Sequence, residues 1–145
     1  MKTNGQNKPI LLVEDNPLDL DLTLRAFAQQ KITNPILVAR NGEEALAFIQ
    51  KWHAGDSEPV VILLDLKLPK ISGLEVLEMI KSHPKYKTIP IVVLTSSDES
   101  SDVKKAYLLG ANSYIVKPVD FGKFMEVAKN IELYWTVLNL SLIHI

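Results

Sequence analysis

The sequence predicts an α/β domain in which five parallel strands form a doubly wound sheet with five helices around it. Short aliphatic runs alternate along the chain with segments whose apolar residues recur at helical spacing. The aliphatic runs are continuous, which is typical of parallel strands buried on both faces. Right-handed crossovers then place helices over both faces of the sheet. The 145 residues suffice for one such domain, which we expect over residues 9–138, between a flexible tail at 1–8 and a tail at 139–145.

The predicted strands share β-branched or aliphatic residues and are bounded by turn or polar residues. In chain order they are residues 9–13, 35–39, 60–64, 89–94 and 113–116. The helical segments between and after them place apolar residues three or four positions apart. In chain order these residues are Leu20, Leu24 and Phe27; Ala45, Leu46 and Ile49; Leu74, Leu77 and Ile80; Val103, Ala106 and Tyr107; and Phe121, Phe124, Ala128, Ile131, Trp135 and Leu138.

Helix boundary signals agree with this division. Asn16-Pro17 is typical of an N-cap followed by proline at the first helical position. Gly110 is suited to end the fourth helix, and Asp120 to cap the fifth. Each strand–helix pair is therefore supported by the spacing of its apolar residues, and several are also supported by capping or terminating residues.

Composition and charge exclude several classes of function. The net charge is −1 and 23% of residues are charged, so neither disorder nor a broad nucleic-acid surface is indicated. The chain has no cysteine, which excludes disulfides, thiolate metal sites and thiol catalysis. Residues 1–9 carry no apolar signal segment, and the apolar stretch 133–145 is shorter than the roughly 20 residues of a membrane span. We expect a cytoplasmic protein that does not enter the membrane.

Polar residues follow the strands at the ends where functional groups gather in such sheets. Glu14 and Asp15 follow the first strand, Asp65 the third, Thr95 the fourth and Lys117 the fifth. One acid alone is more commonly a helix cap or a solvated strand end. A cap or a solvated strand end does not readily explain polar groups at four strand ends together. If the first and third strands are neighbours, three carboxylates meet at one edge.

Carboxylates packed together repel unless a cation offsets their charge. An all-oxygen site of this kind suits Mg²⁺, which keeps several waters and takes one or two protein carboxylates directly. The sequence therefore predicts a Mg²⁺ site that includes Glu14, Asp15 and Asp65.

These residues, in this order on five strand–helix units, resemble the response-regulator receiver domain of two-component signalling. The loop at 68–73, with Pro69, Ser72 and Gly73, and the turn at 109–111 strengthen the resemblance. The stretch AYLLGANSYIVKP, followed by FGKF, is similar to single-domain receivers that partner bacterial phytochrome histidine kinases. The resemblance covers about residues 9–138. It implies a flavodoxin-like sheet with strand order 2-1-3-4-5.

The resemblance also implies a role for each site residue. Asp65 is the expected phospho-acceptor, held in a half-exposed position, and takes a phosphoryl group from a kinase phosphohistidine. Glu14 and Asp15 hold Mg²⁺ with help from the Lys67 carbonyl, and Lys117 pairs with the phosphoryl oxygens. The chain is expected to be a switch rather than an enzyme, with intrinsic Mg²⁺-dependent self-phosphorylation and autodephosphorylation alone.

Thr95 is the expected reporter of phosphorylation. Its hydroxyl moves inward, and the Tyr114 ring fills the space; the alternative for Tyr114 is an ordinary half-buried aromatic on an edge strand. The resemblance favours a cis Lys117–Pro118 peptide, whereas ordinary X-Pro bonds are mostly trans.

Output is expected to pass through the receiver surface to a downstream protein, because we find no DNA-binding segment in the sequence. The fourth helix, fifth strand and fifth helix carry several aromatic residues that either pack in the core or form a homodimer face. These residues are Tyr107, Phe121, Phe124, Tyr134 and Trp135.

Three other functions use related features. A flavin-binding electron carrier shares the fold, but the acidic segment 14–17 would repel a phosphate. An aspartyl phosphatase of the haloacid type needs a second acid two residues after Asp65, where this chain has Lys67. A scaffold receiver would keep the fold without phosphorylation, and the full set of site residues argues against it.

Overall fold

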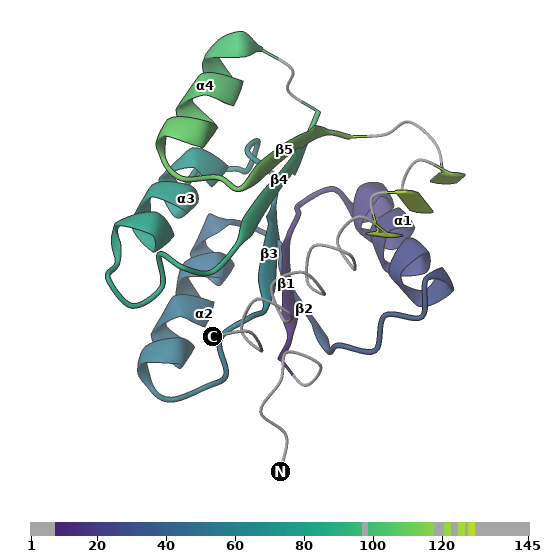
Figure 1. Ribbon diagram of the computed structural model, residues 1–145, viewed down its shortest axis with the longest axis horizontal. Helices are drawn as coiled ribbons and strands as arrows, with labels where there is room; N and C mark the ends of the chain where they lie inside the picture. Colours follow the sequence, from purple (N-terminus) through teal and green to yellow (C-terminus); the bar gives the residue numbers. More distant parts are fainter. Residues whose placement is uncertain (1–7, 97–98, 118–120, 123–124, 127, 130–145) are drawn as a thin grey trace, which may run out of the picture.

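Five parallel strands form one sheet in the order β2-β1-β3-β4-β5, as predicted (Figure 1). The computed structural model describes residues 8–96, 99–117, 121–122, 125–126 and 128–129. Its strands are β1 (Ile10–Val13), β2 (Ile36–Ala39), β3 (Val61–Leu64), β4 (Ile91–Thr95) and β5 (Ser113–Val116). Each strand begins within two residues of its predicted start. The predicted fold class and strand order are confirmed.

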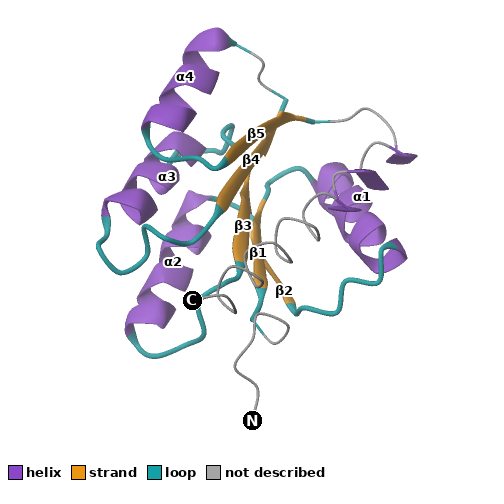
Figure 2. Cartoon of the chain, in the orientation of Figure 1, coloured by secondary structure: helices purple, strands orange, loops and turns teal. Residues whose placement is uncertain are grey.

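Helices lie on both faces of the sheet. Their bounds are α1 (Pro17–Gln29), α2 (Gly42–His53), α3 (Gly73–Ser82) and α4 (Ser100–Leu108). Figure 2 shows α2, α3 and α4 together on one face and α1 on the other. In the predicted fifth helix, residues 121–122, 125–126 and 128–129 are helical. The rest of that segment, including Asp120 as its cap, lies outside the described residues.

The core has two layers because successive strand residues point to opposite faces. In β1, Leu11 and Val13 belong to the cluster that packs on α2, α3 and α4, whereas Ile10 and Leu12 belong to the cluster that packs on α1. The three central strands, β1, β3 and β4, are buried along their whole length. In these three strands the continuous aliphatic runs therefore mark two-sided burial.

The predicted cap at the start of α1 is present. The Asn16 side-chain oxygen accepts hydrogen bonds from the backbone N–H groups of Leu18 and Asp19, at 2.9 and 3.1 Å. Pro17 occupies the first turn. The chain thus turns from β1 into α1 within three residues, which keeps Glu14 and Asp15 at the sheet edge.

Gly110 ends α4 as predicted, with a φ of +108° that a residue with a side chain rarely adopts. Among the described residues, no helix has the length and apolar character needed to cross a bilayer.

Candidate functional site

The carboxyl ends of four strands bring the predicted site residues together. Val13 of β1 is level with Leu64 of β3, and the Asp65 N–H donates to the Val13 carbonyl at 3.1 Å. The residues that follow these two strands, Glu14 and Asp65, therefore lie side by side. Parallel pairing of β3 with β4 and of β4 with β5 places Thr95 and Lys117 at the same edge.

Three carboxylates form a cluster suited to a metal ion. Glu14, Asp15 and Asp65 each offer an oxygen, and these atoms all lie within 4.8 Å of one another. Glu14 and Asp65 are buried, with 3% and 4% of their surface exposed, whereas Asp15 is exposed. The cluster is therefore open to solvent on the Asp15 side. Asp65 is more deeply buried than the half-exposed position expected for it, because its hydrogen-bond partners cover it.

Both carboxylate oxygens of Asp65 accept hydrogen bonds. Oδ1 accepts from the Thr95 hydroxyl at 2.7 Å and from the Lys67 N–H at 3.0 Å. Oδ2 accepts from Lys117 Nζ at 2.9 Å. Hydrogen bonds to a charged acceptor are among the stronger ones in proteins. They offset the cost of burying the Asp65 carboxylate and fix its orientation.

Lys117 contacts three carboxylates at once. Its Nζ lies 2.9 Å from Glu14 Oε1, 2.7 Å from Asp19 Oδ2 and 2.9 Å from Asp65 Oδ2. Burial by itself lowers the pKa of this ammonium, but the hydrogen bonds to Asp19, Glu14 and Asp65 outweigh it and raise the pKa above its usual range. Lys117 is therefore charged at neutral pH.

Glu14 is the carboxyl group of the cluster whose pKa is raised. Burial raises the pKa of Glu14 to about 7; hydrogen bonds from Lys117 and the Asn16 N–H oppose the rise, and the neighbouring Asp65 charge adds to it. We name the group formed by Glu14, Asp15, Asp19, Asp65 and Lys117 the acidic pocket. It sets four carboxylates against one ammonium, so an oxygen-ligated divalent cation fits both its charge and its donor atoms.

A tight turn holds the loop after β3 against the pocket. The Gly73 N–H donates to the Leu66 carbonyl at 2.9 Å, and a Cβ on Gly73 would overlap the Asp65 carbonyl oxygen and the Leu66 Cα. Ser72 caps α3 through its hydroxyl, which accepts from the Glu75 N–H at 3.3 Å. Only glycine fits at the first position of α3, and this close approach keeps the backbone of Asp65 in place.

Three predictions about neighbouring residues have different outcomes. The ring of Tyr114 is half-buried and packs on the core, and its backbone N–H donates to the Tyr107 hydroxyl at 3.1 Å. The Lys67 N–H binds Asp65 Oδ1, while a metal-binding role for the Lys67 carbonyl stays a prediction. Pro118, and with it the predicted cis peptide, lies outside the described residues.

Asp19 was not among the predicted site residues. This residue lies in the first turn of α1, three positions after the N-cap Asn16. An acid three residues after the predicted cap was the available signal. Pairing with Lys117, 98 positions away, could not be read from the sequence.

Comparisons with known proteins agree with this geometry. The chain is 41% identical over 133 residues to "Probable methanogenesis regulatory protein FilR2" of Methanothrix harundinacea (strain 6Ac), covering 91% of this chain and 86% of that protein. It is 38% identical over 130 residues to response regulator Rcp1 of Synechocystis sp., covering 88% of each.

Solved structures give the same result. The phosphorylated cyanobacterial phytochrome response regulator RcpA superposes with a TM-score of 0.82 at 40% identity, over 90% of this chain and 94% of that one. The Mn(2+)-bound form of Rcp1 superposes with a TM-score of 0.79, over 88% and 94%. Residues 10–129 match the family described as response regulator receiver domain. The chain therefore belongs to the response regulator receiver domain family.

Proposed function

We propose that this receiver accepts a phosphoryl group on Asp65 from the phosphohistidine of a sensor histidine kinase and signals through its surface to another protein. The observation that carries the proposal is the buried Asp65 carboxylate, held by Thr95 and Lys117 beside two further acids. Two further acids beside a carboxylate kept only for stability would repel it and gain nothing for the fold.

The transfer exchanges one bond to phosphorus for another. The phosphorus–nitrogen bond of phosphohistidine breaks and its electron pair stays with the imidazole, while an Asp65 oxygen forms the phosphorus–oxygen bond of an acyl phosphate. Lys117 donates hydrogen bonds to the phosphoryl oxygens as they approach, which stabilises their charge. The same chemistry with a small phosphodonor gives self-phosphorylation, and attack by water gives autodephosphorylation.

Mg²⁺ is the proposed metal ion, held by Glu14, Asp15 and Asp65 with the Lys67 carbonyl. The oxygen donors and the excess of negative charge in the acidic pocket support this choice. The solved Mn(2+)-bound form of the similar Rcp1 supports a divalent ion in general. When bound, Mg²⁺ neutralises charge on the transferring phosphoryl group and aligns it with the acceptor.

Thr95 and Tyr114 form the proposed switch. The Thr95 hydroxyl already donates to Asp65 Oδ1, and it would turn to a phosphoryl oxygen once one is attached. Tyr114 lies on β5, paired with the residue two before Thr95 in β4, and its ring is half-buried. A shift of Thr95 is thereby passed to the edge of the sheet next to α4.

A phytochrome-type histidine kinase in the cytoplasm is the proposed donor. The names of the similar RcpA and of other solved bacteriophytochrome response regulators support this partner. The similar FilR2 carries a methanogenesis name instead, so a kinase with another input is the alternative donor.

Comparing wild type with Asp65→Asn tests the proposal. An autophosphorylated histidine kinase is mixed with each protein, with Mg²⁺ or with a chelator, and the label on the receiver is followed over time. Wild type with Mg²⁺ should be labelled within minutes of mixing, and Asp65→Asn should not be labelled. Equal labelling of both would refute the role of Asp65, and a properly folded wild type that is never labelled would favour a scaffold receiver.

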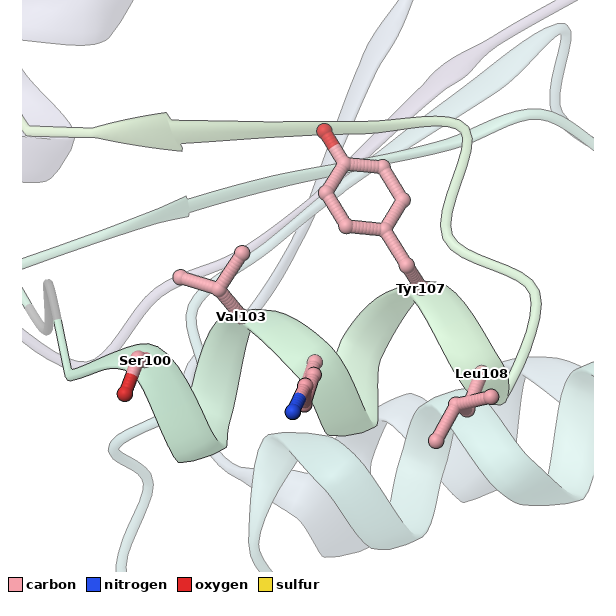
Figure 3. Close-up of a pocket in the computed structure, with 5 residues that line it drawn as sticks. Ser100, Val103, Tyr107 and Leu108 are labelled. Atoms are coloured by element: carbon pink, nitrogen blue, oxygen red, sulfur yellow. The ribbon is translucent and has the colours of Figure 1, made fainter.

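A homodimer through α4, β5 and the following helix is the proposed output. We define the α4–β5 face as Val103, Tyr107 and Leu108 of α4 with Val116 of β5. Its residues are apolar; Val103 is half-buried, whereas Tyr107, Leu108 and Val116 are exposed, and Leu108 is 83% exposed. An open pocket of about 610 Å³ is lined by Ser100, Val103, Lys104, Tyr107 and Leu108. Figure 3 shows Tyr107 extending from α4 toward β5. Exposed apolar groups of this kind favour association.

Sedimentation velocity tests this output. With a phosphoryl mimic bound, the sedimenting mass should double at micromolar concentration, and Leu108→Glu should stay monomeric. A wild type that stays monomeric in both states would contradict homodimerisation and leave a different downstream protein as the partner.

A further inference from the structure

Lys117 has a carboxylate partner outside the expected set of receiver site residues. Asp19 Oδ2 lies 2.7 Å from Lys117 Nζ, the shortest of the three contacts that this ammonium makes. Asp19 comes from the first turn of α1. Its side chain is 23% exposed, compared with 3% for Glu14 and 5% for Asp65.

The ammonium has no hydrogen-bond donor in reserve. A lysine side chain carries three N–H groups, and here three carboxylate oxygens lie within hydrogen-bond distance of Nζ. A phosphoryl oxygen that arrives at Asp65 can be bound by Lys117 only if one of the present bonds is given up.

Burial decides which bond is exchanged at least cost. Before the bond to phosphorus forms, release of Glu14 or Asp65 would leave a buried carboxylate without its cation, which is expensive. Released Asp19 can turn to solvent, because nearly a quarter of its side chain is already exposed. Asp19 is therefore the partner that Lys117 exchanges most easily.

We propose that Asp19 is a positioning residue that holds Lys117 in the unphosphorylated receiver and is displaced by a phosphoryl oxygen, so that its carboxylate sets the affinity of the acidic pocket for a phosphoryl group. This inference rests on the proposed function. It adds an intramolecular competitor to the site: the carboxylate that orders Lys117 also opposes the ligand that Lys117 must bind.

Neutralising Asp19 has opposite effects on the two ligands of the pocket. An anion gains, because one N–H of Lys117 is freed and one nearby negative charge is removed. A divalent cation loses, because the pocket becomes less negative. A role of Asp19 limited to the first turn of α1 would weaken both ligands or neither, since it would act only through the stability of the helix.

Beryllium fluoride, a phosphoryl mimic, and Mg²⁺ alone are the probes. Their dissociation constants are measured by isothermal titration calorimetry, with Mg²⁺ saturating when beryllium fluoride is titrated. The variants are Asp19→Asn, Asp19→Glu to restore the charge, and Asp21→Asn as the matched control. Asp21 lies on the same helix and is 53% exposed in an ion pair with Arg25, so its loss changes the net charge equally.

Asp19→Asn should bind beryllium fluoride about 3- to 10-fold more tightly than wild type, as expected for the removal of one competing charged hydrogen bond. It should bind Mg²⁺ a few-fold more weakly. Asp19→Glu should return toward wild type, and Asp21→Asn should stay within about 2-fold of wild type, as an exposed charge should. If Asp19→Asn fails to fold, Asp19→Ser removes the same charge with a residue common in first turns.

Equal or weaker binding of beryllium fluoride by folded Asp19→Asn would overturn the inference, and so would an equal gain in Asp21→Asn. Failure of the proposed function looks different, because wild type itself would then bind no beryllium fluoride and take no label on Asp65. If wild type binds beryllium fluoride normally and Asp19→Asn binds it equally well, the inference is wrong and the proposed function stands.

Discussion

The acidic pocket and the α4–β5 face depart from ordinary burial in opposite directions. The pocket buries charged groups: Glu14 and Asp65 are 3% and 4% exposed. The face exposes apolar ones: Tyr107 is 50% and Leu108 is 83% exposed. In most domains charged side chains are outside and large apolar ones inside. Within the described residues, both regions therefore depart from the usual distribution of charged and apolar groups.

The two regions differ in what they cost the folded chain. Buried charges interact strongly in a medium of low polarity, so changes in the pocket should alter stability. Exposed apolar side chains make few contacts within the chain, so changes on the face should alter association and leave stability nearly unchanged. Substitutions that remove one interaction at a time test this contrast.

Lys117→Ala should give the largest loss of stability. It leaves the buried carboxylates of Glu14 and Asp65 without their cation, which typically costs about 3–5 kcal/mol. Urea unfolding of the metal-free protein at pH 8 measures the loss, and Mg²⁺ should restore part of it. Lys87→Ala, which removes an exposed lysine, is the control. Equal unfolding free energies for the two variants would show that Lys117 does not stabilise the buried carboxylates of the acidic pocket.

The metal-free protein should become less stable as pH rises from 5 to 8. The pKa of Glu14 is about 7 in the folded protein, against the ordinary value of 4.5 expected once the chain unfolds, so the folded chain holds the proton more tightly. The resulting stabilisation is complete below pH 4.5 and is lost as pH rises through 7, with a fall on the order of 2 kcal/mol.

Unfolding in urea at several pH values measures this dependence. Glu14→Gln should flatten the curve, and saturating Mg²⁺ should also reduce the slope, since the ion binds the deprotonated carboxylate. If the unfolding free energy of wild type stayed constant or rose with pH over this range, the raised pKa of the buried Glu14 would be contradicted.

Thr95→Val should have a smaller effect on stability. It removes the hydroxyl that donates to Asp65 Oδ1 at 2.7 Å and keeps the shape of the side chain, so the loss should be about 1–2 kcal/mol. Thr95→Ser retains the hydroxyl and is the control for the switch. Phosphorylation of Thr95→Val on Asp65 should persist while dimerisation no longer follows it; sedimentation of the phosphorylated variant checks this, and normal coupling would exclude Thr95 as the reporter.

Leu108→Glu on the α4–β5 face should have the smallest effect on stability. Leu108 is almost fully exposed, so the unfolding free energy should change by less than about 0.5 kcal/mol. Association should nevertheless be abolished. A loss of stability as large as that of Thr95→Val would mean that Leu108 packs within the chain, and the contrast between the two regions would fail.

The sequence was sufficient for the sheet and for most of the acidic pocket, because parallel register leaves little freedom. Continuous aliphatic runs located the central strands, and once β1 and β3 pair level, the residues after them must be neighbours. The positions of Glu14, Asp65, Thr95 and Lys117 thus follow from strand ends. The prediction needed only the order of the strands.

Features that depend on side-chain direction and helix placement were not predictable. Glu14 and Asp15 are adjacent in sequence, yet one is buried and the other exposed, because neighbouring residues point to opposite sides at a strand end. Asp19 reaches Lys117 only because the first turn of α1 lies at the sheet edge where β3 and β5 end. The bond from the Tyr114 N–H to the Tyr107 hydroxyl depends in the same way on how α4 lies against β5.

The site of phosphoryl attachment is the most direct test of the central claim, which is that the buried, metal-assisted Asp65 is the acceptor. Wild-type protein is phosphorylated with Mg²⁺ present, treated with borohydride, which reduces an acyl phosphate to an alcohol, and mapped by peptide mass spectrometry. We predict homoserine at position 65 and unmodified aspartate at positions 15 and 19. Reduction at any other acidic residue, with Asp65 intact, would contradict the account.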